Sequence, residues 1–197
     1  MARRYHHGEV RPEAITAALV LTEEGGPEAV TMRAVAARVG IDHRAIYRHF
    51  DDREGLLAEV AALGFADLLE AMQAAGSTPD LTRDFKVAIR FALARPKLYA
   101  LMLSQPRERL FEEGAPEQSV RALLGHFMIA GQALLGPDAS EDTVRSLVFA
   151  ALGASYGLIT LAASMTLAPR SPDALEAFLI EQVTGVIEGQ VLRLTRA

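Results

Sequence analysis

The stretch TMRAVAARVGIDHRAIYRHFDDR, from Thr31 to Arg53, decides the fold of this chain. Its apolar residues recur at the three- and four-residue spacing of a helix, first after Thr31 and again after Asp42. Both residues carry a side-chain oxygen that can accept from the free N–H groups of a first helical turn. Gly40 lies between the two segments, where a helix can end in the left-handed region. The pattern predicts two short helices joined by a tight turn.

The polar side chains of the second segment require a partner outside the chain. Its inward positions are Ala45, Ile46 and Phe50. Its outward positions are His43, Arg44, Tyr47, Arg48 and His49. Helices of about two turns do not persist alone in water, so the pair also requires a scaffold. A helix-turn-helix whose second helix enters the major groove of DNA accounts for both requirements.

Several motifs in this stretch and just after it are shared with one known family. They are an A-x-x-x-G turn at Ala36 to Gly40, a Y-x-H-F ending at Tyr47 to Phe50, the acidic pair Asp51-Asp52 followed by Arg53, and the leucine pair Leu56-Leu57. On these residues, Thr31 to Leu57 resembles the DNA-binding domain of the tetracycline-repressor (TetR) family of bacterial transcription regulators. Beyond residue 75 the resemblance is weaker, and there it includes the segment Arg95 to Met102.

The resemblance implies a sequence-specific regulator, most often a repressor, that binds a palindromic double-stranded DNA operator as a homodimer. The start of the second helix is the end that enters the groove. We therefore expect His43 and Arg44 at base edges, where arginine can bond O6 and N7 of guanine together. The other candidates for DNA contacts are Arg3, Arg4, Thr31, Arg33, Tyr47, Arg48, His49 and Arg53.

These other candidates differ in their expected roles. Contacts to phosphates fix the position of a protein on DNA but do not read its sequence. The residues expected to make such contacts are Thr31, Tyr47, His49 and Arg53. Arg48 suits either role. Arg3 and Arg4 lie in a segment without helical periodicity, which is either a disordered terminus or an arm that reaches into the minor groove.

Composition predicts an all-α protein of the reducing cytoplasm. Half of the 197 residues are hydrophobic, and strand-forming runs are nearly absent. The chain has no cysteine, which removes disulfide scaffolds and thiolate metal sites. No signal peptide is recognised at the start. The net charge of −5 argues against non-specific coating of nucleic acid, although the arginines of the N-terminal part lie mainly on the arm and the recognition face.

We expect a head, a linking helix and a larger body. An arm and a three-helix helix-turn-helix domain occupy residues 1–52, a linking helix occupies 53–75, and a ligand-binding and dimerisation domain occupies 76–197. About nine helices are expected. Besides the two short ones, they cover 12–24, 53–75, 81–94, 98–103, 116–135, 140–167 and 172–195, with a polar loop at 106–115. The first should bury Ile15, Ala18 and Leu19, and Asp51 with Glu54 should cap the linking helix.

The penultimate helix has two interpretations. No charged residue lies between Arg145 and Arg170, so the segment is long enough to span a membrane. It is rich in Ser, Thr, Gly and Ala, however, and has no flanking aromatic belt. A helix that is apolar on all sides can equally be buried in protein. We favour burial and expect no membrane partner.

The last two helices are candidates for a dimer interface. Gly153 and Gly157 share a helix face and permit close approach of a second backbone. With them the predicted interface comprises Phe178, Val183, Val186 and Ile187. These helices could instead fill the core of one monomer, but the resemblance favours the homodimer, because in the TetR family they usually form that interface. Relatives often carry Trp and His-Gly in the penultimate helix, where this chain has Leu152 and Tyr156-Gly157.

No constellation of catalytic residues stands out. The G-x-S-x-G and H-E-x-x-H motifs, a phosphate-binding glycine loop and a cysteine nucleophile are all missing from the sequence, so we expect neither an enzyme nor a cofactor. His6 and His7 lack further ligands at a fixed spacing, so no metal site is predicted.

A regulator needs a second site that is coupled to its DNA-binding head. Large apolar or amphipathic residues of the body suit a small, mostly apolar effector. These candidates are Phe91, Tyr99, Met102, His126, Phe127 and Tyr156. Each can equally be an ordinary core residue. The alternative function is a helical ligand-binding or scaffold protein whose helix-turn-helix no longer binds DNA, which the acidic total favours.

Overall fold

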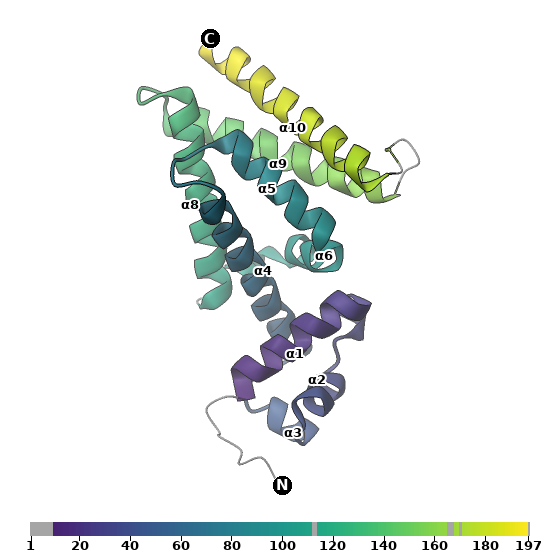
Figure 1. Ribbon diagram of the computed structural model, residues 1–197. Coiled ribbons are helices and arrows are strands. Elements are labelled where there is room, and N and C mark those ends of the chain that lie inside the picture. Colours follow the sequence, from purple (N-terminus) through teal and green to yellow (C-terminus); the bar gives the residue numbers. More distant parts are fainter. Residues whose placement is uncertain (1–9, 112–113, 165–167, 170, 197) are drawn as a thin grey trace. The chain divides into compact units, whose positions relative to one another are not determined.

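The computed structural model describes residues 10–111, 114–164, 168–169 and 171–196. Within these ranges every regular element is a helix, and no strand is present (Figure 1). The elements are α1 (Val10–Gly25), the 3-10 helix η1 (Pro27–Ala29), α2 (Met32–Val39), α3 (His43–Ile46), α4 (Arg53–Ala75), α5 (Leu81–Ala94), α6 (Pro96–Ser104), α7 (Arg107–Leu110), α8 (Ala115–Leu135), α9 (Glu141–Ser164) and α10 (Pro172–Thr195). The predicted all-α fold class is confirmed.

The helix α7 lies where the sequence predicts a polar loop. The amides of Arg109 and Leu110 donate to the carbonyl oxygen of Pro106, at 3.0 and 3.1 Å. Proline favours the start of a helical turn, because its φ is already near the helical value. The loop prediction is therefore wrong for this single turn, which is too short to leave a periodic pattern. The helix expected over residues 140–167 is observed from Glu141 to Ser164, and residues 165–167 lie outside the described ranges.

Contacts divide the chain into two compact units. The N-terminal unit holds the residues up to Ala66 together with Arg95–Val120, and the C-terminal unit holds Asp67–Ala94 with Arg121–Ala197. These units differ from the expected division of the chain at residues 52 and 75. The difference arises because α6 packs on α1 and so belongs to the N-terminal unit. At Gly64 of α4, a Cβ atom would lie 2.6 Å from the sulfur of Met102 on α6, so a larger residue here would displace the Met102 side chain.

Small residues form the buried face of α1. Ala14, Ala17 and Ala18 are buried, whereas Ile15 and Leu19 are only partly buried. The expected inner stripe is therefore wrong for its two larger members. Thr22 is also buried, and its hydroxyl donates to the carbonyl oxygen of Ala18 at 2.9 Å. Small side chains permit close packing of α1 against α2, α3 and α6, which supports the short helix-turn-helix.

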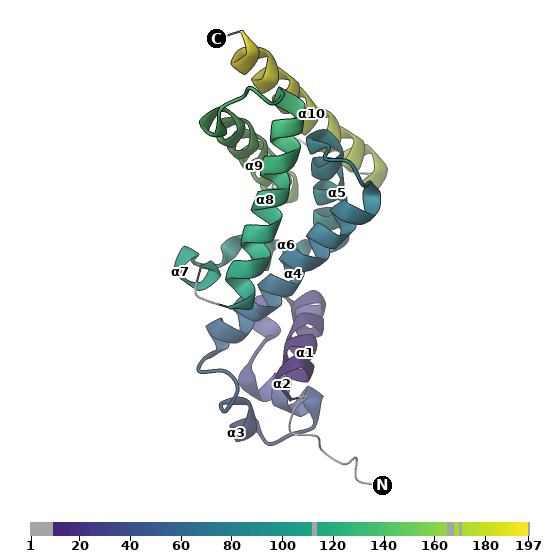
Figure 2. The same cartoon turned by 90° about the vertical axis from the view of Figure 1, so that its left-hand side faces the viewer.

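An aromatic stack lies in the core of the C-terminal unit. The rings of Phe85 on α5 and Phe127 on α8 have centroids 4.9 Å apart and planes 23° apart. Figures 1 and 2 show α9 and α10 side by side, and both contact α5. The buried residues of these two helices include Val144, Leu147, Val148, Ala151, Leu179, Val183 and Ile187. The helices α5, α9 and α10 thus pack together around a shared core.

The helix α9 is less buried than the sequence predicts. By length and composition it could cross a membrane, although the core helix of a soluble protein can pass the same test. Only 22% of its apolar 18-residue window is buried within the single chain. Phe149 is 77% exposed, and Tyr156 and Leu161 are about half exposed. The expectation of burial is therefore wrong for the isolated chain, and a long apolar face stays uncovered.

Candidate nucleic-acid interface

The first helix of the pair, α2, is fixed at both ends as predicted. The hydroxyl of Thr31 accepts from the amide of Ala34 at 3.1 Å, which satisfies one free donor of the first turn. At the other end Gly40 has φ +83°, a conformation that L side chains rarely adopt. The amides of Gly40 and Ile41 both donate to the carbonyl oxygen of Ala36. The turn is thus set by local chemistry, and both predictions are confirmed.

The second helix, α3, is shorter than predicted. Asp42 caps it by accepting from the amide of Arg44 at 2.8 Å. The regular helix ends at Ile46, and the chain continues in tight turns to Phe50, whose amide donates to the carbonyl oxygen of Ile46 at 3.1 Å. The side chains of Ile46 and Phe50 are buried and anchor this segment to the unit. A segment this short depends on its anchors for its orientation.

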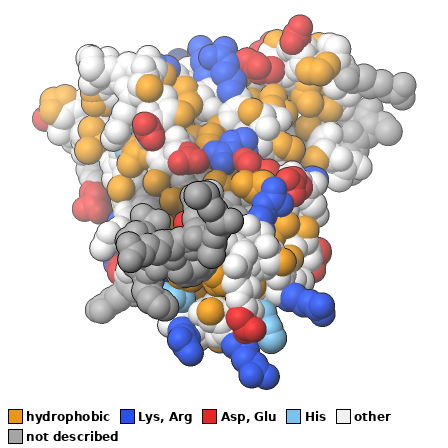
Figure 3. All heavy atoms as spheres, turned by 60° about the horizontal axis from the view of Figure 1, so that its bottom comes forward, with side chains coloured by type: hydrophobic (Ala, Val, Ile, Leu, Met, Phe, Trp, Pro, Cys, Tyr) orange, Lys and Arg blue, Asp and Glu red, His pale blue; other side chains and the backbone are white. Residues whose placement is uncertain are grey.

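A polar face remains exposed on this pair, and we call it the recognition face. Its members are Thr31, Arg33, His43, Arg44, Tyr47 and Arg48. Tyr47 is 54% exposed although the adjacent Ile46 is fully buried. Basic side chains and histidines project in the lower part of Figure 3. His49, also a predicted contact, is only partly buried, and Arg3 and Arg4 lie outside the described residues.

One acidic side chain lies beside this face. Asp42 is exposed, and its carboxylate is 3.8 Å from Nδ1 of His43. A negative charge here disfavours approach to phosphates, whereas it can accept from N4 of a cytosine. The N-cap therefore places a negative charge beside the exposed basic side chains of this face.

Arg53 does not point its donors to solvent. Its Nε donates to the carbonyl oxygen of Val30 at 2.7 Å, and its Nη2 donates to that of Pro27 at 2.6 Å. Its Nη1 lies 3.3 Å from the carboxylate of Glu54. The sequence places Arg53 at a phosphate, but in the structure it ties the start of α4 to the η1 turn ahead of α2.

Arg38 of α2 is also occupied by a partner within the chain. Its two terminal nitrogens donate to the two carboxylate oxygens of Glu24 on α1, each at 2.8 Å. This hydrogen-bonded pair lowers the pKa of Glu24 below its usual value of 4.5 and raises that of Arg38. The pair fastens α2 to α1 on the solvent side.

The start of α4 is capped by Asp52 rather than by Asp51. The Asp52 carboxylate accepts from the amide of Gly55 at 2.6 Å, and the helix begins at Arg53. The prediction of a cap at Asp51 is therefore wrong by one residue, because two adjacent acids fit the same pattern. The other Asp52 oxygen lies 2.7 Å from Nη2 of Arg109 on α7.

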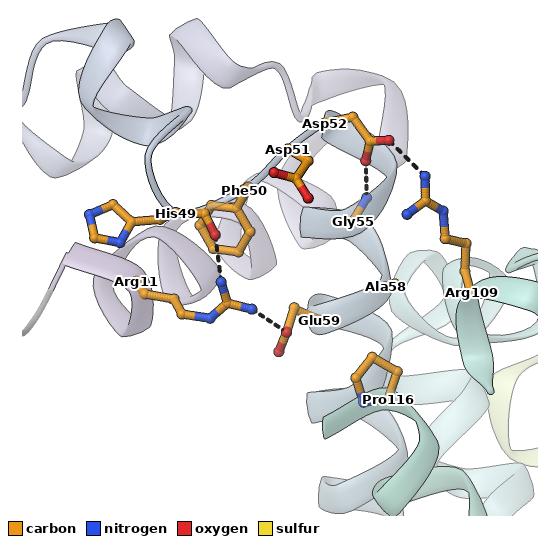
Figure 4. Close-up of a pocket in the computed structure, with 10 residues that line it drawn as sticks. All are labelled: Arg11, His49, Phe50, Asp51, Asp52, Gly55, Ala58, Glu59, Arg109 and Pro116. Atoms are coloured by element: carbon orange, nitrogen blue, oxygen red, sulfur yellow. Dashed lines mark hydrogen bonds and ion pairs between the residues drawn. The ribbon is translucent and has the colours of Figure 1, made fainter. Parts of the chain in front are cut away.

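A pocket of about 210 Å³ opens beside the connection between α3 and α4 (Figure 4). It is lined by Arg11, His49, Phe50, Asp51, Asp52, Gly55, Ala58, Glu59, Arg109 and Pro116. Figure 4 shows Arg11 reaching into it from one side and Arg109 from the other. Neither arginine stands out in the sequence, because each meets its partners more than 35 residues away along the chain.

The predicted effector-binding residues fall in both units. Tyr99 and Met102 belong to the N-terminal unit, and the others belong to the C-terminal unit. Met102 is buried against Gly64, and Phe127 is buried in the aromatic stack. His126 is only partly buried, with its Nε2 2.8 Å from the fully buried carboxylate of Asp84.

Two polar groups of the C-terminal unit were not predicted from the sequence. Asp84 accepts from Arg83 through its other oxygen, at 2.9 and 3.2 Å, so both of its oxygens are satisfied. Ser155 of α9 is 2% exposed, and its hydroxyl has no hydrogen-bond partner among the described residues. Buried polar groups normally have a partner, so this hydroxyl is an exception among the buried polar groups of the unit.

The predicted dimer residues divide into buried and accessible ones. Val183 and Ile187 are about 1% exposed and face the core of their own chain, so their assignment to a seam between chains is wrong. Gly153 of α9 is exposed, and nothing lies within 4 Å of a Cβ built there. The same open space surrounds Gly157, and Phe178 and Val186 are partly buried.

Two family models match this chain. The model for bacterial regulatory proteins of the tetR family matches residues 14–60. The model for the tetracyclin repressor-like C-terminal domain matches residues 81–184. No curated protein matches the sequence significantly.

Solved structures of similar fold cover nearly the whole chain. A protein of unknown function from Rhodococcus sp. RHA1 is 25% identical, with a TM-score of 0.65 over 96% of this chain and 97% of that chain. A TetR transcriptional regulator from the same organism is 18% identical, with a TM-score of 0.63 over 92% and 98% of the two chains. A TetR variant from Acinetobacter baumannii AYE in complex with minocycline is 19% identical, with a TM-score of 0.64 over 94% and 96%. The last two show the fold alone.

Proposed function

The chain belongs to the TetR family of bacterial regulatory proteins and is a DNA-binding transcription regulator, and from this premise we propose that it is a repressor that binds a palindromic operator as a homodimer. The observation that carries the proposal is the recognition face on α2 and α3. The cap Asp42 and the buried anchors Ile46 and Phe50 hold the short helix α3, yet its basic and aromatic side chains are left in solvent. Exposed basic and aromatic side chains on a firmly held short helix suit contacts in the major groove of DNA.

We divide the DNA contacts by their position on this face. His43 and Arg44 begin α3 and take base edges, whereas Tyr47 and Thr31 lie where phosphates pass. In the capping bond the Thr31 hydroxyl oxygen is the acceptor, so the hydroxyl can still donate its proton to a phosphate. Arg33 and Arg48 complete the positive charge. Arg53 has its donors on backbone carbonyls, so we assign it a supporting role, and Arg3 and Arg4 stay proposed minor-groove contacts.

We assign the homodimer to the uncovered face of α9 and α10. The large exposed side chains on it are Phe149, Tyr156, Leu161 and Leu192. Between them lie glycines around which a Cβ would meet nothing within 4 Å, at positions 153, 157, 185 and 189. Small residues at four-residue spacing permit close approach of a second helix, and two such helices per chain can form a two-fold four-helix interface. Burial in a dimer removes the apolar face from water without a membrane.

We propose that a small, mostly apolar molecule binds in the C-terminal unit and releases the operator. Its polar anchors would be His126, which is held by Asp84, and the unpartnered hydroxyl of Ser155. Phe91, which is partly buried, is the accessible apolar candidate of this unit, and Phe127 contributes only if the core repacks. Tyr99 and Met102 belong to the N-terminal unit, and Tyr156 lies on the face assigned to the homodimer. The minocycline complex of the A. baumannii relative supports a ligand site in this fold. The helix α4 would transmit the change, because it continues from one unit into the other.

The alternative is a ligand-binding or scaffold protein whose helix-turn-helix has lost DNA binding. The net charge of −5 favours it. A gel-shift assay with fragments of the source genome at moderate salt separates the two. Specific retention of a small number of fragments supports the regulator, whereas no retention, or equal retention of all fragments, supports the alternative. An effector is then sought by thermal shift, and each hit is added to an operator titration. Stabilising hits that leave operator affinity unchanged would refute the coupling.

A further inference from the structure

The connection from Phe50 to Asp52 links α3 to α4, and it borders the pocket described above. The pocket of about 210 Å³ opens directly beside it (Figure 4). The position of a segment is normally fixed by side chains packed against it. Here the pocket takes the place of part of that packing. Polar contacts must therefore supply what packing does not.

Arg11 of α1 supplies most of those contacts. Its Nη1 donates to the carbonyl oxygen of His49 at 2.5 Å, and its Nη2 donates to the carboxylate of Glu59 on α4 at 2.5 Å. Its guanidinium carbon also lies 4.7 Å from the ring centroid of Phe50, the anchor that follows α3. One side chain thus joins three elements, and each of its contacts uses a different part of the guanidinium.

The geometry of these contacts suits arginine and no other residue. Arginine has a planar fork of donors and stacks on aromatic faces, whereas lysine is a point charge with one nitrogen. The Glu59 carboxylate is 18% exposed and accepts from one end of the fork, which leaves the other end aimed at the carbonyl. Phe50 is 5% exposed, so its ring holds the guanidinium from the protein side.

We propose that Arg11 is a positioning residue for operator recognition, which sets the orientation of α3 by holding the carbonyl of His49 and the ring of Phe50. It acts on the base-reading residues through the backbone and does not itself read DNA. The inference rests on the proposed function, because it assumes that α3 reads a sequence. Arg11 lies on α1, outside the helix pair α2 and α3, and by this role it contributes to the discrimination between DNA sequences.

The test compares Arg11→Gln with wild-type protein on two duplexes of equal length. One is the duplex that the wild-type protein selects from a random-sequence library, and the other is an unselected sequence. Loss of a charge-assisted hydrogen bond that holds α3 should lower affinity for the selected duplex by about tenfold or more. Affinity for the unselected duplex should change by less than about threefold, because the phosphate contacts remain.

Two further variants separate positioning from other roles. Glu59→Gln keeps an oxygen acceptor for Arg11 and should retain selected-duplex affinity within about threefold. Arg11→Lys keeps the charge but loses the fork, so it should restore only part of the affinity that Arg11→Gln loses. Hydrogen exchange of the amides between residues 43 and 50 should be faster in Arg11→Gln, with exchange in the middle of α1 unchanged.

Three results would overturn the proposal. Equal loss on both duplexes with a flatter salt dependence would make Arg11 a phosphate contact. Faster exchange throughout α1 with a lower unfolding temperature would make it a general stabiliser. Wild-type-like affinity in Arg11→Gln would remove its role. Failure of the wild-type protein to select any duplex is a different outcome, since it would refute the proposed function before Arg11 is tested.

Discussion

Phe149 gives the sharpest prediction about assembly, because its ring is 77% exposed in the single chain. Burial of an aromatic side chain covers about 200 Å², so about 150 Å² of this ring is available to a partner. At about 25 cal/mol per Å², full burial would contribute about 4 kcal/mol per copy. Allowing for incomplete burial and for the carbon that alanine retains, we expect Phe149→Ala to cost about 2 kcal/mol per copy.

A two-fold interface contains this side chain twice. Phe149→Ala should therefore raise the dimer dissociation constant by about a thousandfold, which corresponds to about 4 kcal/mol. Sedimentation equilibrium over a wide range of concentrations measures this constant. The unfolding temperature of the isolated monomer should hardly change, because the ring makes little contact within its own chain.

Val183→Ala is the matched control for this measurement. Val183 is 1% exposed and lies on α10 in the core of its own chain. Its truncation should lower the free energy of unfolding by about 1–2 kcal/mol and leave the dimer dissociation constant nearly unchanged. The assignment of the interface is refuted if Phe149→Ala dimerises as wild type does while Val183→Ala dissociates. A wild-type chain that is monomeric at micromolar concentration would also contradict it.

Four further predictions concern the DNA-binding unit. Arg44→Ala should cost about 1–3 kcal/mol and relax preference at one base pair per half-site, and equal loss on every sequence in a titration series would contradict this. Gly40→Ala should lower the free energy of unfolding by about 1–2 kcal/mol, because φ is +83°, and Gly40→Asn should cost less; equal thermal shifts would count against the turn assignment. Arg53→Gln should destabilise the fold by about 1–3 kcal/mol without flattening the salt dependence of DNA binding, and a flatter slope would restore the phosphate role. Arg38 lowers the pKa of Glu24, so their pair stabilises the fold above pH 4.5 and this contribution is lost as pH falls through the lowered value. The difference in unfolding temperature between wild type and Glu24→Gln should thus vanish at low pH, and a constant difference would refute the pairing.

The local features of the helix-turn-helix could be predicted from the sequence. Caps at Thr31 and Asp42 and a left-handed turn at Gly40 depend on atoms within a few residues, and one side-chain type satisfies each requirement. The ends of the long helices follow from Gly and Pro in the same way. Adjacent candidates such as Asp51 and Asp52 could not be separated, because both fit the spacing of a cap.

The non-local features could not be predicted in this way. Arg53 looks like a phosphate contact in a motif, but its two carbonyl acceptors lie at Pro27 and Val30. The partner of His126 is Asp84, a residue 42 positions away on another helix. Such contacts depend on which helix faces approach each other, which the spacing of residues within one helix does not specify.

The last helix presents a related ambiguity. Apolar residues lie on more than one side of α10, so periodicity alone does not say which side faces the core. The structure places Val183 and Ile187 inside and leaves Leu192 about half exposed. Two of the residues that the sequence assigns to an interface on α10, Val183 and Ile187, therefore lie in the core of their own chain, and the choice of helix stays a prediction.

The central claim is that this chain reads DNA sequence as a two-fold dimer, and selection from a random-sequence duplex library tests it most directly. We predict enrichment of one palindrome whose half-sites lie about one helical turn or a multiple apart, bound by two chains per duplex. Arg44→Ala should then lose preference at one symmetric pair of positions. Enrichment of no sequence, or of a site without two-fold symmetry bound by a single chain, would contradict the account.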